Sequence, residues 1–144
     1  MADRQASRIE ALFAERFPKS AEHYRRATKL FPSGVTHDAR YLKPFPIYAN
    51  EALGSHKTTV EKHVLIDYWM GHGAMLLGHS HPAVVEAVQK QAAISTHPGA
   101  CHELELAWGE RVQQLVPSAE RIRFTNSGTE ATLMALRVAR LATG

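Results

Sequence analysis

The stretch Arg123-Phe124-Thr125-Asn126-Ser127-Gly128-Thr129-Glu130-Ala131 contains the strongest structural signal in this chain. Its start, residues 122–125, is predicted to form a short strand, followed by a polar turn. A helix is predicted to begin at Gly128, because apolar residues recur with helical spacing from Ala131 to Leu141. A strand is thus predicted to lead into a helix through a tight turn.

The predicted start of this helix is a candidate anion site. Ser127 occupies the N-cap position and Glu130 follows three residues later, which is the pattern of a capping box. The free N–H groups near Gly128 and Thr129 are expected to point outward at the positive end of the helix dipole, and a glycine lets a phosphate come close to the backbone. Most capping boxes bind nothing, so the pattern by itself indicates only a helix start.

The composition is typical of a globular protein in a reducing compartment. The chain has 144 residues, of which 44% are hydrophobic and 22% charged. A formal charge of +3 would suit nucleic acid, but the basic residues are scattered among acids and form no run with aromatic residues. A single cysteine, Cys101, excludes an internal disulfide. No apolar run has the length of a signal peptide or membrane span, so a cytoplasmic protein is predicted.

The N-terminal half is predicted to contain two helices, a loop and a hairpin. Residues 7–17 have a helical apolar stripe, and a second helix capped by Ser20 follows Pro18. A polar loop is expected over residues 34–41. A hairpin is expected to follow this loop.

Residues 126–131, Asn-Ser-Gly-Thr-Glu-Ala, resemble the phosphate cup of fold-type I pyridoxal-phosphate enzymes, in particular class III aminotransferases and their glutamate-1-semialdehyde aminomutase branch. The resemblance implies pyridoxal 5'-phosphate as cofactor, with Ser127, Gly128 and Thr129 at its phosphate. It also implies an α/β fold, in which residues 1–66 form an N-terminal segment. Residues 67–144 would then begin the large domain, with an incomplete parallel or mixed sheet and its helices.

Two further positions are implied to contact the substrate. Residues 31–40 match the family's Pro-Gly-Gly-Val-Asn-Ser-Pro-Val-Arg stretch, which makes Arg40 the expected clamp for a substrate carboxylate. His37 stands where the family has a serine, a departure that bears on the aminomutase substrate. His72 stands where aminomutases place an aromatic residue of the pocket wall. The segment from Leu76 to Pro82 resembles the family's Leu-Gly-His-x-His-Pro segment.

The resemblance also implies a hairpin over residues 54–67, because the family has a strand-turn-strand unit there. Its turn would fall on Glu61-Lys62. Because neither residue favours positive φ, a wider loop is an alternative.

The resemblance also implies what this stretch lacks. In the family, the lysine that bonds covalently to the cofactor and the carboxylate at the pyridine nitrogen both lie well after the phosphate cup. None of the lysines here has that context: Lys19, Lys29, Lys43, Lys57, Lys62 and Lys90. The chain alone is therefore expected to have no catalytic residue and no activity, to expose the apolar faces of its last three helices, and to be unstable by itself. The intact enzyme is expected to be a homodimer.

Three functional hypotheses remain open from the sequence. The first is the N-terminal portion of an enzyme that moves an amino group between an amino acid and a carbonyl compound, as an aminomutase or a transaminase. The second is a non-catalytic phosphate-binding or dimerisation remnant. The third is a metal protein based on the histidines from His72 to His102, but these lack the ligand spacings of known zinc motifs.

Overall fold

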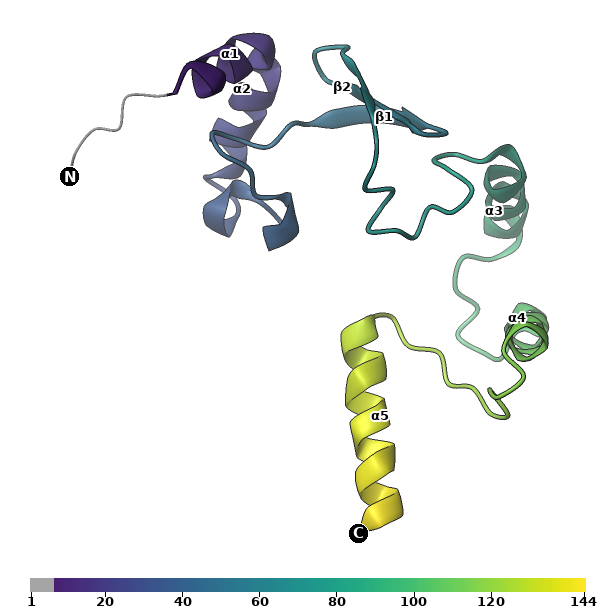
Figure 1. Cartoon of the computed structure of the whole chain (residues 1–144). Helices are drawn as coiled ribbons and strands as arrows, with labels where there is room; N and C mark the ends of the chain where they lie inside the picture. Colours follow the sequence, from purple (N-terminus) through teal and green to yellow (C-terminus); the bar gives the residue numbers. More distant parts are fainter. Residues whose placement is uncertain (1–6) are drawn as a thin grey trace. The chain divides into compact units, whose positions relative to one another are not determined.

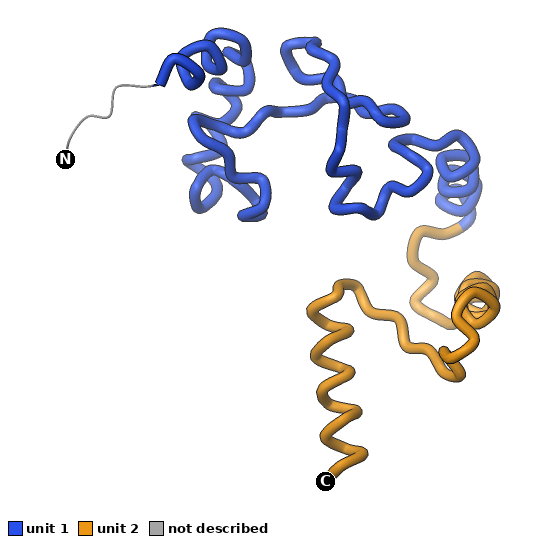
Figure 2. Tube along the Cα trace, in the orientation of Figure 1, with its two compact units in different colours: residues 1–94 blue, residues 95–144 orange. Residues whose placement is uncertain are grey.

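The computed structural model describes residues 7–144, which fall into two compact units, Met1–Ile94 and Ser95–Gly144 (Figures 1 and 2). The first contains α1 (Arg8–Arg16), α2 (Pro18–Ala27), the 3-10 turns η1 (Pro32–Gly34) and η2 (Asp38–Arg40), β1 (Ala49–Leu53), β2 (His56–Thr59), β3 (Val64–Ile66) and α3 (Pro82–Ile94). The second contains α4 (Glu103–Leu115) and α5 (Gly128–Thr143).

The two N-terminal helices form where the sequence predicts them, but the start of α2 differs. Its N-cap residue is Phe17, and Pro18 occupies the first turn, where its missing N–H costs nothing. Ser20, expected to be the cap, instead lies inside the helix and is fully buried. Its backbone N–H and hydroxyl both donate to the Glu61 carboxylate, at 2.6 and 3.2 Å. A carboxylate distant in sequence therefore takes over the role predicted for Ser20.

The sheet is antiparallel, in the order β1-β2-β3, so β2 is its central strand. The connection from β2 to β3 is wider than two residues, since Thr59 ends one strand and Val64 begins the next. Lys62 takes a positive φ of 72° there, and the fully buried Thr59 hydroxyl accepts the N–H groups of Glu61 and His63, each at 3.2 Å. The wider loop is thus confirmed. It leaves the N–H groups of Glu61 and His63 without strand partners, and the Thr59 hydroxyl accepts both.

A small aromatic cluster is the only part of the described first unit with large buried apolar side chains. Phe13 packs against Phe17 and Phe45 with ring centroids 4.9 and 5.1 Å apart, and the His63 ring meets the Phe17 edge at 5.4 Å. Phe17 and Phe45 are buried. This cluster joins α1 to the segment before β1 and to the β2–β3 turn.

In the second unit, the predicted strand over residues 122–125 is wrong. This segment joins no sheet in the described part of the chain, although its Phe124 ring stacks on Trp108 of α4 with centroids 3.8 Å apart. A strand exists through hydrogen bonds to a neighbouring strand, and none lies alongside within this unit. The helix α5 begins at Gly128, as the sequence predicts.

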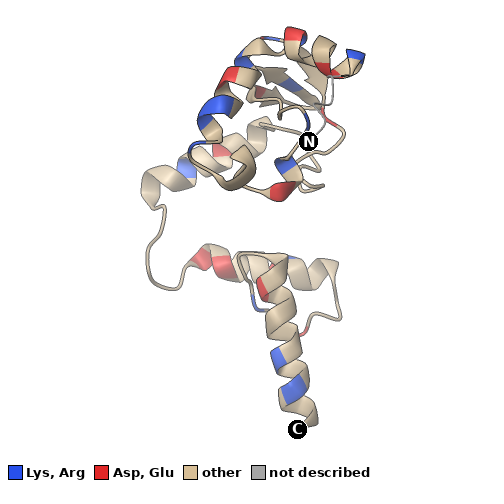
Figure 3. Ribbon diagram, turned by 90° about the vertical axis from the view of Figure 1, so that its left-hand side faces the viewer, with Lys and Arg blue, Asp and Glu red and all other residues tan. Residues whose placement is uncertain are grey.

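Acidic and basic residues both occur along the helices of residues 7–144 (Figure 3). Figure 3 shows Lys and Arg mixed with Asp and Glu along the helices, and on α5 the acidic Glu130 occupies the first turn while Arg140 occupies the last. That order complements the helix dipole. Within residues 7–144, no helix is long and apolar enough to cross a membrane.

Candidate functional site

Arg40 ends the 3-10 turn η2, in a conformation that its neighbours fix. The Nδ1 atom of His37 accepts the N–H of Ala39 at 3.1 Å, which caps the turn. The Nη1 atom of Arg40 donates to the Thr36 hydroxyl at 2.9 Å. No carboxylate of the described residues pairs with this guanidinium, so its other N–H groups remain available to a ligand.

His72 lies beside the same turn. It takes a left-handed φ of 61° in an irregular loop that follows Asp67, and its ring meets the edges of Trp69 and His37 at centroid distances of 5.4 and 5.9 Å. His37 belongs to the turn that ends at Arg40. The two residues predicted to contact substrate therefore come from neighbouring segments of the first unit, although they are distant in sequence.

Asp67 organises this loop, and sequence reasoning assigned it no role. Its Oδ1 atom accepts the N–H groups of Trp69 at 2.9 Å and Met70 at 3.1 Å. Its Oδ2 atom lies 2.6 Å from Nε2 of His79 and 2.9 Å from Nζ of Lys57. The side chain is only 4% exposed. A signal was present, because the aspartate directly follows a strand and the family segment containing His79 comes shortly after.

The contacts of Asp67 favour its ionised form. The hydrogen bond from His79, then that from Lys57, hold the pKa of this carboxyl far below its ordinary value, against a smaller opposing effect of burial. The two backbone N–H groups add to the depression. Asp67 is therefore a fixed negative charge that holds a lysine, a histidine and a loop in one arrangement.

A second contact holds the loop end that carries His79. Gly54 and His79 exchange two backbone hydrogen bonds of 2.9 Å each. Gly78 approaches so closely that a Cβ atom there would lie 3.0 Å from the Cα of Gly54, and its φ of 85° favours glycine. Residues 78–79 thus dock against the β1–β2 turn.

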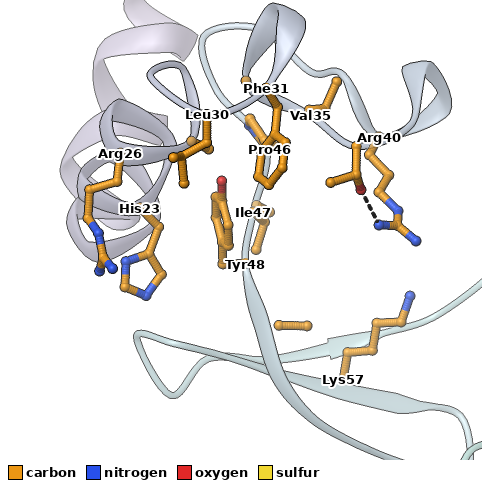
Figure 4. Close-up of a pocket in the computed structure, with 14 residues that line it drawn as sticks. His23, Arg26, Leu30, Phe31, Val35, Arg40, Pro46, Ile47, Tyr48 and Lys57 are labelled. Atoms are coloured by element: carbon orange, nitrogen blue, oxygen red, sulfur yellow. Dashed lines mark hydrogen bonds between the residues drawn. The ribbon is translucent and has the colours of Figure 1, made fainter.

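The first unit also contains a cavity of about 720 Å³ between α2, the two 3-10 turns and the sheet (Figure 4). Its cationic lining residues are Arg26, Arg40 and Lys57, and no aspartate or glutamate lines it. Aromatic and aliphatic side chains supply the rest of the wall, among them Phe31 and Ile47. Such a cavity suits an anion with an apolar body.

The start of α5, in the second unit, is an open helix N-terminus. The Ser127 hydroxyl accepts the N–H of Glu130 at 3.2 Å, as predicted. The other half of the capping box is shifted by one residue, because the Glu130 carboxylate accepts the N–H of Asn126 at 2.7 Å instead of that of Ser127. Residues 127–129 are exposed, and nothing lies within 4 Å of a Cβ atom built on Gly128.

These residues fit a phosphate group. Among the described residues, the N–H groups of Gly128 and Thr129 have no hydrogen-bond partner. Their position at the positive end of a helix of 16 residues favours an anion. The Thr129 hydroxyl and the O–H of Ser127 add two donors. The arrangement therefore offers both backbone and side-chain donors, without an obstruction at the glycine.

The histidines do not gather around a possible metal. His79 and His102 make the hydrogen bonds expected of turn and cap residues, with Asp67 and with the N–H of Leu104. The Nδ1 atom of His81, by contrast, is buried and lacks a partner among the described residues. Within residues 7–144, no three His, Cys, Asp or Glu side chains are placed to hold one ion.

Known proteins match this chain over most of its length. The chain is similar to the glutamate-1-semialdehyde 2,1-aminomutase of Methanopyrus kandleri, with 44% identity over 132 residues, and to that of Chloroflexus aurantiacus, with 44% over 137 residues. These matches cover 92% and 93% of this chain but only 31% of each relative. The chain thus spans about a third of the length of the curated relatives it matches.

Solved structures give the same fold. The model matches a β-phenylalanine aminotransferase from Variovorax paradoxus with a TM-score of 0.91 and 27% identity, covering 94% of this chain and 31% of that one. It matches a transaminase with bound pyridoxal phosphate with a TM-score of 0.83 and 34% identity, covering 86% and 29%. The predicted α/β fold of fold-type I transaminases is thereby confirmed. The family model for class-III aminotransferases matches residues 37–143, and the chain belongs to that family.

Proposed function

We propose that this chain is the N-terminal portion of a pyridoxal-phosphate enzyme that moves an amino group between an amino acid and a carbonyl compound. The observation that carries the proposal is the open start of α5, where unpaired N–H groups and the hydroxyls of Ser127 and Thr129 are available to a phosphate. It lies within the part of the chain that the class-III family model matches.

The cofactor, when bound, supplies an electron sink for bond breaking at the amino-bearing carbon. The residues described here bind and orient. Gly128 and Thr129 anchor the phosphate, Arg40 takes the substrate carboxylate through its free N–H groups, and His72 forms part of the pocket wall beside His37. A fixed carboxylate limits the orientations that the bound substrate can take.

An aminomutase and a transaminase both agree with this arrangement. The curated relatives are named as aminomutases, whereas two of the structural neighbours are named as transaminases or aminotransferases. The resemblance places a serine where this chain has His37, and an aromatic residue where it has His72. This difference favours a transaminase that acts on a different substrate. We also propose that the intact enzyme is a cytoplasmic homodimer, in agreement with an unpaired Cys101.

Equilibrium binding of pyridoxamine phosphate and of pyridoxamine tests the phosphate site. These probes differ only in the phosphate and lack the aldehyde that would react with exposed lysines. We expect the phosphate form to bind at least about tenfold more tightly, because charge-assisted hydrogen bonds to an anion are the strong ones. The substitutions S127A and T129V should remove most of that difference.

The control for these variants is T132V. The Thr132 hydroxyl lies one turn further along α5 and donates to the carbonyl of Gly128 at 2.9 Å, away from the free N–H groups. This variant should bind pyridoxamine phosphate as the unmodified chain does. Equal affinity for the two probes would show that the start of α5 is only a helix terminus and would overturn the proposal.

A further inference from the structure

Lys57 is a second cation in the cavity that contains Arg40, and neither the family resemblance nor the comparisons assign it a role. It lies in the central strand β2, opposite Ala52 on one side and Leu65 on the other. In Figure 4 its side chain extends from the sheet toward the guanidinium of Arg40. The two cations thus approach one part of the cavity from different elements.

An ion pair with Asp67 holds the side chain of Lys57 in place. Its Nζ atom lies 2.9 Å from Oδ2 of Asp67, whose side chain is 4% exposed, while Lys57 itself is 35% exposed. An ammonium group has three donors, so one bond to Asp67 leaves the others for a ligand. Because His79 and two backbone N–H groups also hold the carboxylate, Asp67 cannot follow Lys57 if that side chain moves. Asp67 is therefore a positioning residue.

The positive charge of the cavity is only partly balanced, because Lys57 shares Asp67 with His79, and Arg26 and Arg40 pair with no carboxylate of the described residues. Arg26, Arg40 and Lys57 line it, with no acidic lining residue, and Asp67 is withdrawn behind Lys57. Cations that face one another across a cavity repel, and an anion placed between them removes the repulsion. The neighbouring wall, which includes Ile47 and Tyr48, is apolar. The missing partner is thus an anionic group attached to an apolar body.

We propose that Arg40 and Lys57 form a two-cation subsite for one carboxylate of the substrate, with Asp67 holding Lys57 in place. The substrate class is a carboxylate that carries an aliphatic or aromatic body. This inference rests on the proposed function, since it extends the carboxylate contact assigned there to Arg40. It adds a residue from the sheet to a contact otherwise made only from a 3-10 turn.

Binding of 3-phenylpropionate to the chain, measured by ligand-observed NMR at low ionic strength, tests the subsite. Its neutral amide serves as the matched probe. We expect the acid to bind at least about tenfold more tightly than the amide, and K57M to weaken acid binding by about tenfold through loss of one charge-assisted contact. K57R should restore most of the affinity, because it keeps the charge.

Two variants make each outcome decisive. K62M removes an exposed lysine from the same hairpin, one that pairs only with Glu51 at 3.4 Å, and should leave binding unchanged. R40Q should weaken acid binding whether or not Lys57 takes part. If R40Q weakens binding while K57M does not, the role of Lys57 is overturned and the proposed function stands. In a chain whose helices are verified as folded by circular dichroism, equal or absent binding of acid and amide overturns the subsite altogether.

Discussion

At the scale of single residues, Asp67 determines how the first unit responds to acid. Its pKa is depressed by His79, then Lys57, relative to about 3.9 in an unfolded chain. A carboxyl with a depressed pKa contributes stability that is fully present above the unfolded pKa and is lost as the pH falls toward the folded one. We therefore expect the loop after β3 to open progressively below about pH 4.

Hydrogen exchange of the Trp69 and Met70 amides between pH 7 and 3 measures this response. Their protection, corrected for the intrinsic pH dependence of exchange, should fall below about pH 4, because the opened loop binds a proton at Asp67 while the closed loop, in which both amides donate to Oδ1, does not. D67N should lower protection at neutral pH and make it independent of acid. Protection that stays constant to pH 3 in the unmodified chain would contradict the assignment.

Gly78 provides a second test at this scale. G78A should destabilise the contact between residues 78–79 and the β1–β2 turn by about 1–3 kcal/mol, because it combines a left-handed backbone with a Cβ atom 3.0 Å from Gly54. G73A is the matched control, with a similar φ of 82° and nothing within 4 Å. Exchange of the His79 amide should show a larger loss of protection in G78A; equal losses would mean that the close approach has no cost.

At the scale of elements, the start of α2 depends on a carboxylate from another element. Glu61 accepts both the N–H and the hydroxyl of Ser20, and that hydroxyl in turn accepts the N–H of Tyr48 at 3.1 Å. Burial is the largest single effect and would raise the pKa of Glu61, but the bonds from Ser20, together with smaller ones from the backbone of Glu61 and from Thr59, lower the pKa overall. One carboxylate thus joins α2, the β2–β3 turn and the segment before β1.

Removal of this carboxylate should loosen all three elements. We expect E61A to cost about 1–3 kcal/mol, because it leaves a buried backbone donor of Ser20 unsatisfied. E61Q should cost less, since its amide oxygen still accepts the N–H of Ser20, although the charge at the helix N-terminus and the second acceptor oxygen are lost. E51A, on the same hairpin but exposed, serves as control. Protection of the Ser20 amide measures each change, and equal protection in E61A and E51A would refute the role.

At the scale of the whole molecule, most large apolar side chains are exposed, as the sequence predicts for the last three helices. The exposed residues on α3, α4 and α5 include Val84, Val88, Ile94, Leu104, Leu106, Leu115, Leu133, Leu136 and Leu141. The buried apolar residues of the described chain are Phe17, Ala27 and Phe45. So small a core leaves the isolated chain with low stability, because little apolar burial opposes the conformational entropy of a chain this long.

The purified chain is therefore expected to bind a hydrophobic dye and to associate on heating. L141Q, at a position that is 87% exposed, should reduce association without loss of helix, because it removes apolar surface and no packing. Dye fluorescence and light scattering during a thermal ramp measure both effects. A reversible two-state transition in the unmodified chain would contradict this expectation.

The sequence by itself determined the features that depend only on residues close together in the chain. Ser127 caps α5 because its hydroxyl reaches an N–H three residues away, and Pro82 begins α3 because a first-turn residue needs no donor. The same local signals predicted the open start of α5, which is proposed to bind a phosphate. The sequence also offered the wider β2–β3 loop as an alternative to a turn on Glu61-Lys62.

Only the tertiary structure decided which distant residues meet. Ser20 and Glu61 are 41 positions apart, and Asp67 and His79 are 12 apart, so no local pattern reveals either pair. The ion pair of Lys57 with Asp67 and the contact of His72 with His37 also form only because one segment packs on another. Residues 122–125 fail as a strand for the converse reason: strand propensity is local, but a strand requires a partner that this unit does not contain.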